Sequence, residues 1–387
     1  MSETTRAPEP TVSLALAVAL MGRAQAAATG SPAPATPAAP ADDVRALVKA
    51  ARALRCLSLV AEPLVADRDC PPDLADELGR IRSGTWATYA VTQAAVAPAL
   101  AQAHAEGLDV IVYKGGAYAA RYYAQPSTRP MTDIDLLVSP QDRDGLSQLL
   151  RARGFRGMST PARRWSGRLA HESTFASSLP GARTVDIHTA PAPPARYRLP
   201  VADMRARARP GMLWDAPVRF LAPEDELLVM AANQAYDHFR FGFVRFLDAW
   251  LLCRAERLEW SGVITRARAA GVATALHATL SNARRVAGLS VPSEVLRALE
   301  PAPVRRAWLR AMLHTEALGD PRFDLPRRLE QLLLVYPFVD RPLDFAGFAL
   351  YHGALRALDA GQELVDRARG RSSTRSSTRS STRSSRE

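Results

Sequence analysis

The hydrophobic pattern is densest at residues 108–138. Val110 to Tyr113 is a short apolar and β-branched run that predicts a buried strand. Lys114-Gly115-Gly116 follows, and residues 117–123 then predict a short helix. A second strand is predicted over residues 134–138, and it begins with two aspartates, Asp133 and Asp135. We expect the rest of the chain to be organised around this strand–helix–strand segment.

Upstream of this segment the spacing of apolar residues is helical. One helix is predicted to begin at Asp42-Asp43, which can cap it, and a longer one runs from Asp73 to His104. Gly107 is a typical residue to end the longer helix. We expect both helices to cover one face of a sheet as scaffold.

Downstream, a helix is predicted over residues 142–153. Residues 171–177 and 184–188 have the composition of two strands, and Pro180-Gly181 between them predicts a turn. These two strands would form an antiparallel pair. Together with the first two strands they predict a mixed sheet with flanking helices.

Beyond Pro223 the pattern is helical almost throughout. We therefore expect a second, α-helical domain. Its helices are predicted at residues 227–238, 243–258, 261–270, 274–287, 293–299, 305–318, 326–336 and 343–368.

The two ends of the chain lack such patterning. Residues 1–41 predict a disordered Ala/Pro-rich leader with a weak helix at the apolar run of residues 12–21. That run also suggests a signal peptide, but it lacks a positively charged flank and is too short to span a bilayer. Residues 369–387 carry an Arg-Ser-Ser-Thr repeat and predict a disordered tail. Two folded domains are then predicted. Residues 42–215 contain the N-terminal helices and the sheet, and residues 216–368 form the α-helical domain.

Length and composition fit two globular domains: 387 residues, of which 47% are hydrophobic and 23% charged. The net charge of +11 overstates the basicity of the body, because the seven arginines from Arg367 to the end of the chain, minus Glu387, supply six of these charges. A mildly basic body suits a nucleoside triphosphate without requiring a nucleic acid. Three scattered cysteines favour a reducing compartment, so we expect a cytoplasmic protein without a membrane partner.

Two carboxylates begin the second predicted strand. Asp133 and Asp135 are one residue apart, and side chains alternate along a strand, so both carboxylates emerge on the same face. Two like charges this close repel each other unless a cation lies between them. Mg²⁺ is the simplest such cation, because it binds carboxylates together with substrate phosphates. A solvated strand end is the alternative, but the apolar run after the aspartates favours a metal site.

This order of residues resembles a known family. The chain resembles an uncharacterised bacterial branch of the nucleotidyltransferase superfamily related to DNA polymerase β. The shared pattern is, in order, an apolar strand, Lys114-Gly115, a helix, Arg129 and Asp133-Ile134-Asp135. The resemblance implies an α+β fold: a polymerase-β-like mixed sheet with flanking helices, followed by an α-helical C-terminal domain. The likeness extends through Gly154-Phe155 and Val185-Asp186-Ile187-His188 and loosely into the helical half.

The resemblance also implies a reaction. A nucleoside monophosphate would pass from a nucleoside triphosphate (NTP) to an acceptor, assisted by two Mg²⁺ or Mn²⁺ ions about 4 Å apart. Asp133 and Asp135 would bind both ions. Asp186, placed between apolar neighbours on its own strand, would complete the site of the ion that activates the acceptor hydroxyl.

Lys114, Gly115 and Gly116 would lie under the triphosphate. Glycines allow the backbone to approach phosphates, and the N–H groups of the following helix favour anions. Where relatives have a hydroxyl after the first glycine, this chain has Gly116, so a contact there would come from the backbone. A plain strand-to-helix turn is the alternative. Arg129 would meet a β- or γ-phosphate, or else form an ion pair on the surface.

Three histidines are candidates for the acceptor side: His171, His188 and His238. His188 lies two residues from Asp186 and shares its face, so an ordinary hydrogen bond is the alternative there. In the helical half, His238, Arg245 and Asp248 match polar positions of the family, and an interhelix contact is their alternative. The further ligands that a zinc site needs are missing.

We therefore expect a Mg²⁺-dependent nucleotidyltransferase whose acceptor is a small molecule or biosynthetic intermediate. One alternative is modification of RNA or of a protein side chain, as in toxin–antitoxin relatives. Another is a degenerate module that binds a nucleotide without turnover. A nucleic-acid partner is not favoured, and the sequence does not identify the base, the acceptor or the oligomeric state.

Overall fold

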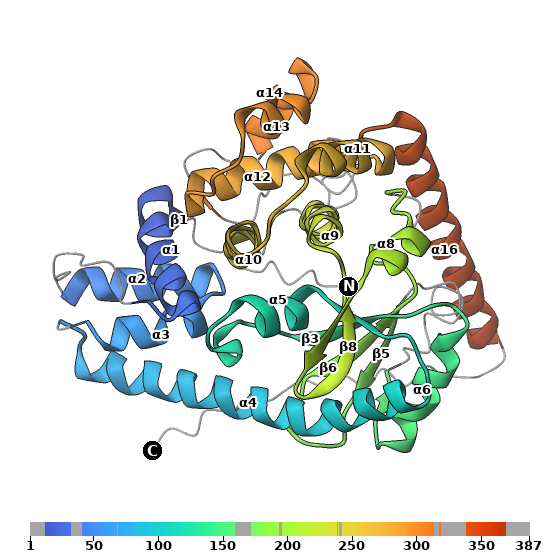
Figure 1. Ribbon diagram of the computed structural model, residues 1–387, viewed down its shortest axis with the longest axis horizontal. Coiled ribbons are helices and arrows are strands. Elements are labelled where there is room, and N and C mark those ends of the chain that lie inside the picture. The colour runs from blue at the N-terminus through green and yellow to red at the C-terminus, as the bar shows by residue number, and fades with distance from the viewer. Residues whose placement is uncertain are drawn as a thin grey trace.

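The fold combines a mixed sheet with many helices (Figure 1). The structure, a computed structural model, describes residues 12–31, 41–67, 69–158, 172–192, 196–237, 239, 242–312, 317–318 and 338–368. The predicted α+β fold class, a mixed sheet with flanking helices, is confirmed. Within these ranges, every helix is too short or too polar to cross a membrane.

The seven-stranded sheet has the predicted strand–helix–strand segment at its centre. β2 and β3 pair antiparallel and α5 (Lys114–Tyr122) connects them. β6 lies parallel to β3, and β5 runs antiparallel to β6, as the turn at Pro180-Gly181 predicted. The strands are, in order across the sheet, β4 (Arg156–Gly157), β5 (Glu172–Ala176), β6 (Thr184–His188), β3 (Asp133–Leu137), β2 (Ile111–Tyr113), β8 (Ala216–Phe220) and β7 (Arg209–Leu213).

The two faces of the sheet have different partners. Ile134 and Leu136 of β3 are buried against α4 (Pro72–Ala105) and α6 (Asp142–Ala152), which cover one face. Asp133, Asp135 and Leu137 alternate with them and therefore face the other way, toward the helical part of the chain. Figure 1 shows α4 below the sheet, with α9 and α10 on the opposite side.

The chain beyond Pro223 is helical, as predicted, up to Met312. The predicted helix over residues 305–318 ends earlier, because Ala317–Leu318 form β9, which pairs with β1 (Val12–Ser13). The predicted helix at 326–336 lies outside the described residues. The helices are α9 (Pro223–Tyr236), α10 (Gly242–Ala255), α11 (Trp260–Ala270), α12 (Ala273–Ala287), α13 (Ser293–Ala298), α14 (Pro303–Met312) and α16 (Pro342–Ala368).

The weak helix predicted at residues 12–21 is confirmed from Leu14 onward, whereas the prediction of disorder is wrong for residues 22–29, because the helix continues through them. Residues 14–29 are thus helical throughout. They form α1 (Leu14–Thr29), which packs with α12 and with α3 (Leu57–Val65); α2 (Ala41–Ala53) follows. Small and apolar side chains at three- and four-residue intervals, including the fully buried Leu20, join the main core. Gln25 Nε2 also donates to the Ala287 carbonyl at 2.7 Å. The other leader residues, 1–11 and 32–40, and the tail, 369–387, lie outside the described residues.

The predicted domain boundary between residues 215 and 216 is also misplaced. β7 and β8 form a hairpin through Trp214 and Asp215, and β8 pairs in parallel with β2. The sheet therefore extends to Phe220. The sequence concealed these strands, because each contains a proline, and because the turn residues adopt positive φ (52° and 64°) without a glycine.

The packing of α1 generates a stability prediction. Replacing the fully buried Leu20 with Ala should lower the free energy of unfolding by ~2–5 kcal/mol, because it leaves a cavity in the core. Val18 lies on the same helix with 45% of its surface exposed, and Val18→Ala should cost less than about 0.5 kcal/mol. Urea titration of the two variants measures both values. Equal, negligible effects would instead indicate that residues 14–29 do not pack on the core.

Candidate active site

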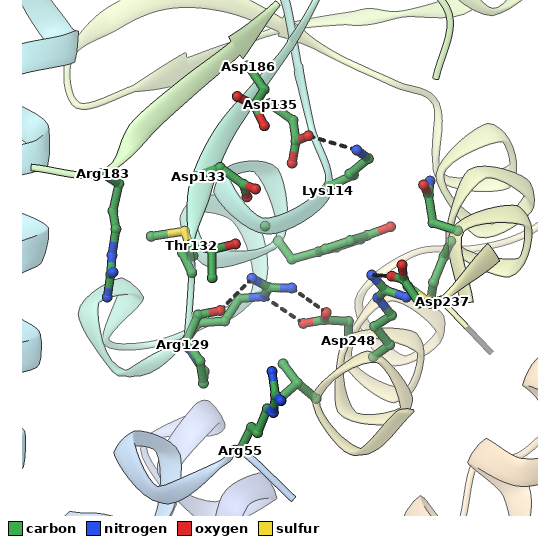
Figure 2. Close-up of a pocket in the computed structure, with 18 of the residues that line it drawn as sticks. Arg55, Lys114, Arg129, Thr132, Asp133, Asp135, Arg183, Asp186, Asp237 and Asp248 are labelled. Atoms are coloured by element: carbon green, nitrogen blue, oxygen red, sulfur yellow. Dashed lines mark hydrogen bonds and ion pairs between the residues drawn. The ribbon is translucent and has the colours of Figure 1, made fainter. Parts of the chain in front are cut away.

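Three carboxylates meet on one face of the sheet. In the parallel pairing of β3 with β6, Asp135 lies directly beside Asp186, and Asp133 lies beside Thr184. Asp133 and Asp135 share a face by alternation, as expected. The structure therefore brings together the three aspartates that the sequence analysis selected (Figure 2).

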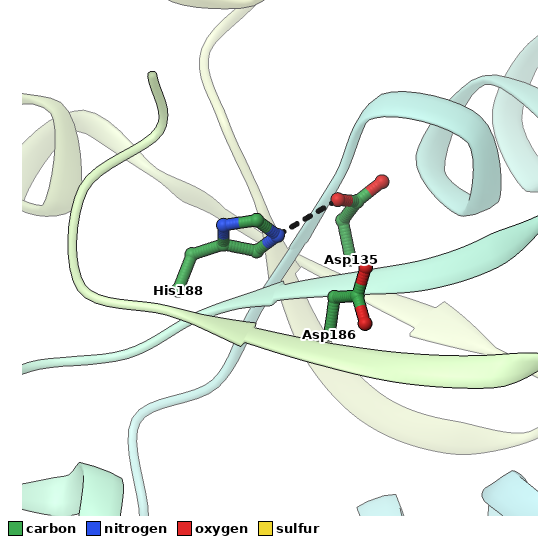
Figure 3. A group of neighbouring side chains, drawn as sticks. All are labelled: Asp135, Asp186 and His188. Atoms are coloured by element: carbon green, nitrogen blue, oxygen red, sulfur yellow. Dashed lines mark hydrogen bonds and ion pairs between the residues drawn. The ribbon is translucent and has the colours of Figure 1, made fainter. Parts of the chain in front are cut away.

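Asp135 is the most strongly hydrogen-bonded of the three. Its Oδ1 accepts from Lys114 Nζ at 2.7 Å and from His188 Nε2 at 2.9 Å (Figure 3). Burial favours the protonated acid, but Lys114 and His188 outweigh it and lower the pKa of Asp135 to about 2. Burial and the Lys114 charge lower the pKa of His188, so its ring is neutral and donates through Nε2.

Asp133 and Asp186 are in the opposite electrostatic state. Burial, followed by the charge of Asp135, raises the pKa of Asp133 to about 6. Burial and nearby carboxylates, Asp133 first among them, raise the pKa of Asp186 to about 7. Asp186 Oδ1 is buried and has no hydrogen-bond partner among the described residues. The group therefore has more negative charge than its neighbours compensate, which is the state that a bound cation would relieve.

The ligand atoms also have suitable spacing for a metal ion. One ligand atom each from Asp135, Asp186 and His188 lies within 4.8 Å of the others. Two of these are carboxylate oxygens, which hard divalent cations prefer. The carboxylates present thus fit a metal ion, whereas His188 Nε2 already donates to Asp135 and holds that carboxylate in place. His188, a candidate for the acceptor side, is instead buried and hydrogen-bonded to Asp135, as its alternative stated.

Lys114, Gly115 and Gly116 form the first turn of α5, so the helix begins three residues earlier than predicted. Lys114 adopts a φ of +54°, which is uncommon for a residue with a side chain. A Cβ on Gly115 would lie 2.8 Å from Arg129 Nη1, and one on Gly116 would lie 3.3 Å from Val112 Cγ1. Both glycines therefore allow close packing against their neighbours, and this role is independent of the predicted contact with a phosphate.

Arg129 is buried beneath this turn. Its Nε and Nη2 donate to Asp248 Oδ1 and Oδ2 at 3.0 and 2.7 Å, and the Tyr123 hydroxyl donates to the same carboxylate at 2.8 Å. The alternative given for Arg129, an ion pair at the surface, is right about the ion pair and wrong about its location: the pair is buried and joins the α5–β3 connection to α10. The predicted contact of Arg129 with a phosphate stays a prediction.

A cavity of about 610 Å³ opens onto the acidic group. The start of α5, the middle of α4, and helices α9 and α10 supply other walls. Asp248 lines it, as does Arg245, whose Nη2 donates to Asp237 at 2.5 Å. The two remaining histidine candidates, His171 and His238, lie outside the described residues.

Several cavity residues were missed in the sequence. Arg183 precedes β6 without any motif around it, and its position follows only from the pairing of β6 with β3. Thr85, Thr88 and Thr92 on α4 did give a signal: their spacing places three hydroxyl groups on one helix face.

The buried ion pair generates a prediction. Asp248→Asn and Arg129→Met should each lower the free energy of unfolding by ~3–5 kcal/mol, because each leaves the opposite charge buried without its partner. Replacing both residues with apolar ones should cost less than the sum of the two. Urea titration of this double-mutant cycle measures the coupling. Arg45→Met, which breaks an exposed ion pair with Asp73, is the control and should change little. Additive losses would show that the two charges do not depend on each other.

Comparison with known proteins identifies a family whose match includes the acidic group. Residues 40–288 match the model of a family described as uncharacterised nucleotidyltransferase. Curated proteins gave no match. Among solved structures, the antibiotic-resistance factor ANT(2'')-Ia, whose solution structure is described as revealing substrate-regulated conformation dynamics, is 18% identical, with a TM-score of 0.32. The likeness covers 46% of this chain and 89% of that one.

The family match spans the sheet, the acidic group and helices α9 to α12. It covers more than half of the 387 residues. The chain therefore belongs to this family of uncharacterised nucleotidyltransferases, and it is an enzyme of that class.

Proposed function

We propose that the enzyme transfers a nucleoside monophosphate from an NTP to a hydroxyl group of a small-molecule acceptor, with Mg²⁺ bound by Asp133, Asp135 and Asp186. The convergence of these three carboxylates beside a cavity carries the proposal. A volume of about 610 Å³ is in the range of small-molecule sites.

The chemistry of the three aspartates supports the metal. Asp133 and Asp186 have raised pKa values because their charges are buried near one another, and Asp186 Oδ1 has no hydrogen-bond partner among the described residues. When bound, Mg²⁺ would supply Lewis-acid stabilisation of the charge that develops on the reacting oxygens. His188 would hold the Asp135 carboxylate in position through its hydrogen bond.

The start of α5 is the proposed triphosphate site. Gly115 lines the cavity at the N-terminus of this helix, where backbone N–H groups and the helix dipole favour an anion. Lys114 Nζ already lies 2.7 Å from Asp135, so its charge is next to the carboxylates that share the metal with the phosphates. We infer that Lys114 offsets the negative charge of the triphosphate.

The reaction forms a bond between the acceptor oxygen and the α-phosphorus. The bond between the α-phosphorus and the bridging oxygen breaks, and pyrophosphate leaves with its electron pair. Asp186, with an oxygen that has no hydrogen bond to the described residues, takes the proton of the acceptor hydroxyl. Arg129 and Asp248 hold the α5–β3 connection against α10 while this happens.

The charges of the cavity favour a small acceptor over a nucleic acid. A nucleic-acid groove is lined mainly by cations, which neutralise phosphates. Among the described residues that line this cavity, carboxylates are at least as numerous as cations. The charged lining residues are Asp133, Asp135, Glu172, Asp186, Asp237 and Asp248, with Arg55, Lys114, Arg129, Arg183 and Arg245. The presence of all three aspartates also speaks against a degenerate module.

The carboxylates generate the first functional prediction. Asp133→Asn, Asp135→Asn and Asp186→Asn should each reduce Mg²⁺-dependent pyrophosphate release by about 10²–10³-fold, because the site loses charge that holds the cation. EPR of Mn²⁺ in the presence of a non-hydrolysable NTP should show the same loss of binding, independently of the acceptor. The control is Asp144→Asn on the exposed surface of α6, which should bind metal and nucleotide like the wild type.

The opposite result is equally informative. If the nucleotide binds without metal, and Asp133→Ala/Asp135→Ala leaves that binding unchanged, the protein is a binding module. The proposed reaction would then be wrong.

The raised pKa values generate a pH prediction. As the pH falls below about 7, the metal-free carboxylate of Asp186 (pKa about 7) gains a proton, and below about pH 6 that of Asp133 (pKa about 6) does so too; a cation must displace these protons. Metal affinity should therefore fall as the pH falls through these two values. Calorimetry in two buffers of different ionisation enthalpy should also detect more protons released per ion at about pH 6.5 than at about pH 8.5. An affinity that does not change over this range would contradict the prediction.

A further inference from the structure

The cavity has a second polar wall on the side of α4. It consists of Thr85, Thr88, Tyr89 and Thr92, at helical spacing on one face of α4, together with Arg183. We call these five residues the α4 wall. In Figure 2, Arg183 and Lys114 lie on opposite sides of Asp133. The acidic group thus lies between the proposed triphosphate site and the α4 wall.

Arg183 is fixed at its backbone and available at its side chain. Its N–H donates to the Thr92 hydroxyl at 3.0 Å, which ties the start of β6 to α4. The next residue, Thr184, pairs with Asp133, so Arg183 borders the acidic group. The guanidinium is exposed and forms no hydrogen bond or ion pair with any other described residue. This leaves a cationic group in the cavity for a ligand.

The remainder of the wall offers hydroxyl groups and an aromatic ring. The Thr88 hydroxyl has no hydrogen-bond partner within the described ranges, whereas the Thr92 hydroxyl donates to the Thr88 carbonyl at 2.7 Å. Tyr89 is held edge-on against Trp214, with ring centroids 5.7 Å apart. Hydroxyl groups both donate and accept, so this surface suits a ligand that carries hydroxyl groups itself.

Building on the function proposed above, we propose that the α4 wall binds the acceptor. We further propose that the acceptor is a small polyhydroxyl molecule with a phosphate or carboxylate group, which Arg183 binds. In phosphoryl transfer the attacking and leaving oxygens lie roughly in line, on opposite sides of the phosphorus. With pyrophosphate leaving on the side of Lys114, the acceptor approaches from the opposite side, where the α4 wall lies.

The charge of Arg183 selects the acceptor class. A guanidinium binds phosphate or carboxylate through paired N–H donors, which neutral polyols cannot match. A hydroxyl group of the same molecule attacks the α-phosphorus and passes its proton to Asp186, and pyrophosphate leaves. The anionic group stays intact and anchors the acceptor.

The test uses matched probes with the nucleotide site filled. Wild-type enzyme is saturated with Mg²⁺ and α,β-methylene-ATP, and calorimetry then measures binding of glycerol 3-phosphate against glycerol, and of gluconate against glucose. We expect at least one anionic probe to bind about tenfold or more tightly than its neutral partner. Arg183→Met should remove this preference and change the nucleotide Kd less than about twofold.

Two further variants sharpen the test. Arg82→Met removes an exposed arginine of α4 outside the cavity and should leave both ligands unaffected. Thr88→Val should weaken the polyhydroxyl probe but not inorganic phosphate, because only the probe has hydroxyl groups for Thr88 to bind.

Three results would overturn the inference. The first is no binding of any probe by an enzyme that binds the nucleotide. The second is equal binding of anionic and neutral probes. The third is a loss of nucleotide affinity in Arg183→Met, which would place Arg183 on the triphosphate side. If the wild type binds no nucleotide, the proposed function fails instead, and Arg183-dependent binding of the anionic probes alone would still support the α4 wall.

Discussion

Three carboxylates lie close together on one face of the sheet, two of them buried and Asp133 partly buried, and this imposes the main constraint on the structure. Buried charges are costly unless they are paired, hydrogen-bonded or neutralised. The three carboxylates differ in how their charge is compensated. Lys114 and His188 keep Asp135 ionised, whereas Asp133 and Asp186 lack such partners among the described residues and have raised pKa values. A site with one ionised and two readily protonated carboxylates can exchange protons for a cation without rebuilding its surroundings. The parallel register of β3 and β6 produces this state, because it leaves Asp135 and Asp186 side by side.

The buried Arg129–Asp248 pair extends this constraint to the helical part. Arg129 lies close under Gly115, where any Cβ would meet its guanidinium, and Asp248 belongs to α10. One ion pair therefore joins the first turn of α5 and the α5–β3 connection to α10, which forms a wall of the cavity. Removing either partner leaves a buried charge, so the pair specifies how the two parts fit together more than it adds stability.

Local patterns in the sequence were sufficient to predict the centre of the fold. The alternation around Asp133 and Asp135, and the apolar neighbours of Asp186, depend only on strand periodicity, and both strands are found at those positions. Long-range partners were not predictable. Nothing near Arg129 indicates Asp248, more than a hundred residues away, and nothing in the Ala-rich run of α1 indicates that it packs on α12. The prolines of β7 and β8 concealed a hairpin that only its pairing with β2 reveals.

The long helix α4 connects packing with the proposed chemistry. Its 34 residues span about 51 Å, far more than a strand of this sheet, so different parts of one helix meet different partners. Leu78 near its start joins the core of the helical part, and Val96 and Leu100 near its end pack under the apolar face of the sheet. The threonines between them line the cavity. Because both ends are held in hydrophobic cores, the middle presents polar groups from a rigid support, as a substrate-binding wall requires. Side chains alternate between the two faces of β3, so Ile134 packs against α4 while Asp133 faces the cavity. The same alternation thus produces both the core under the sheet and the acidic group.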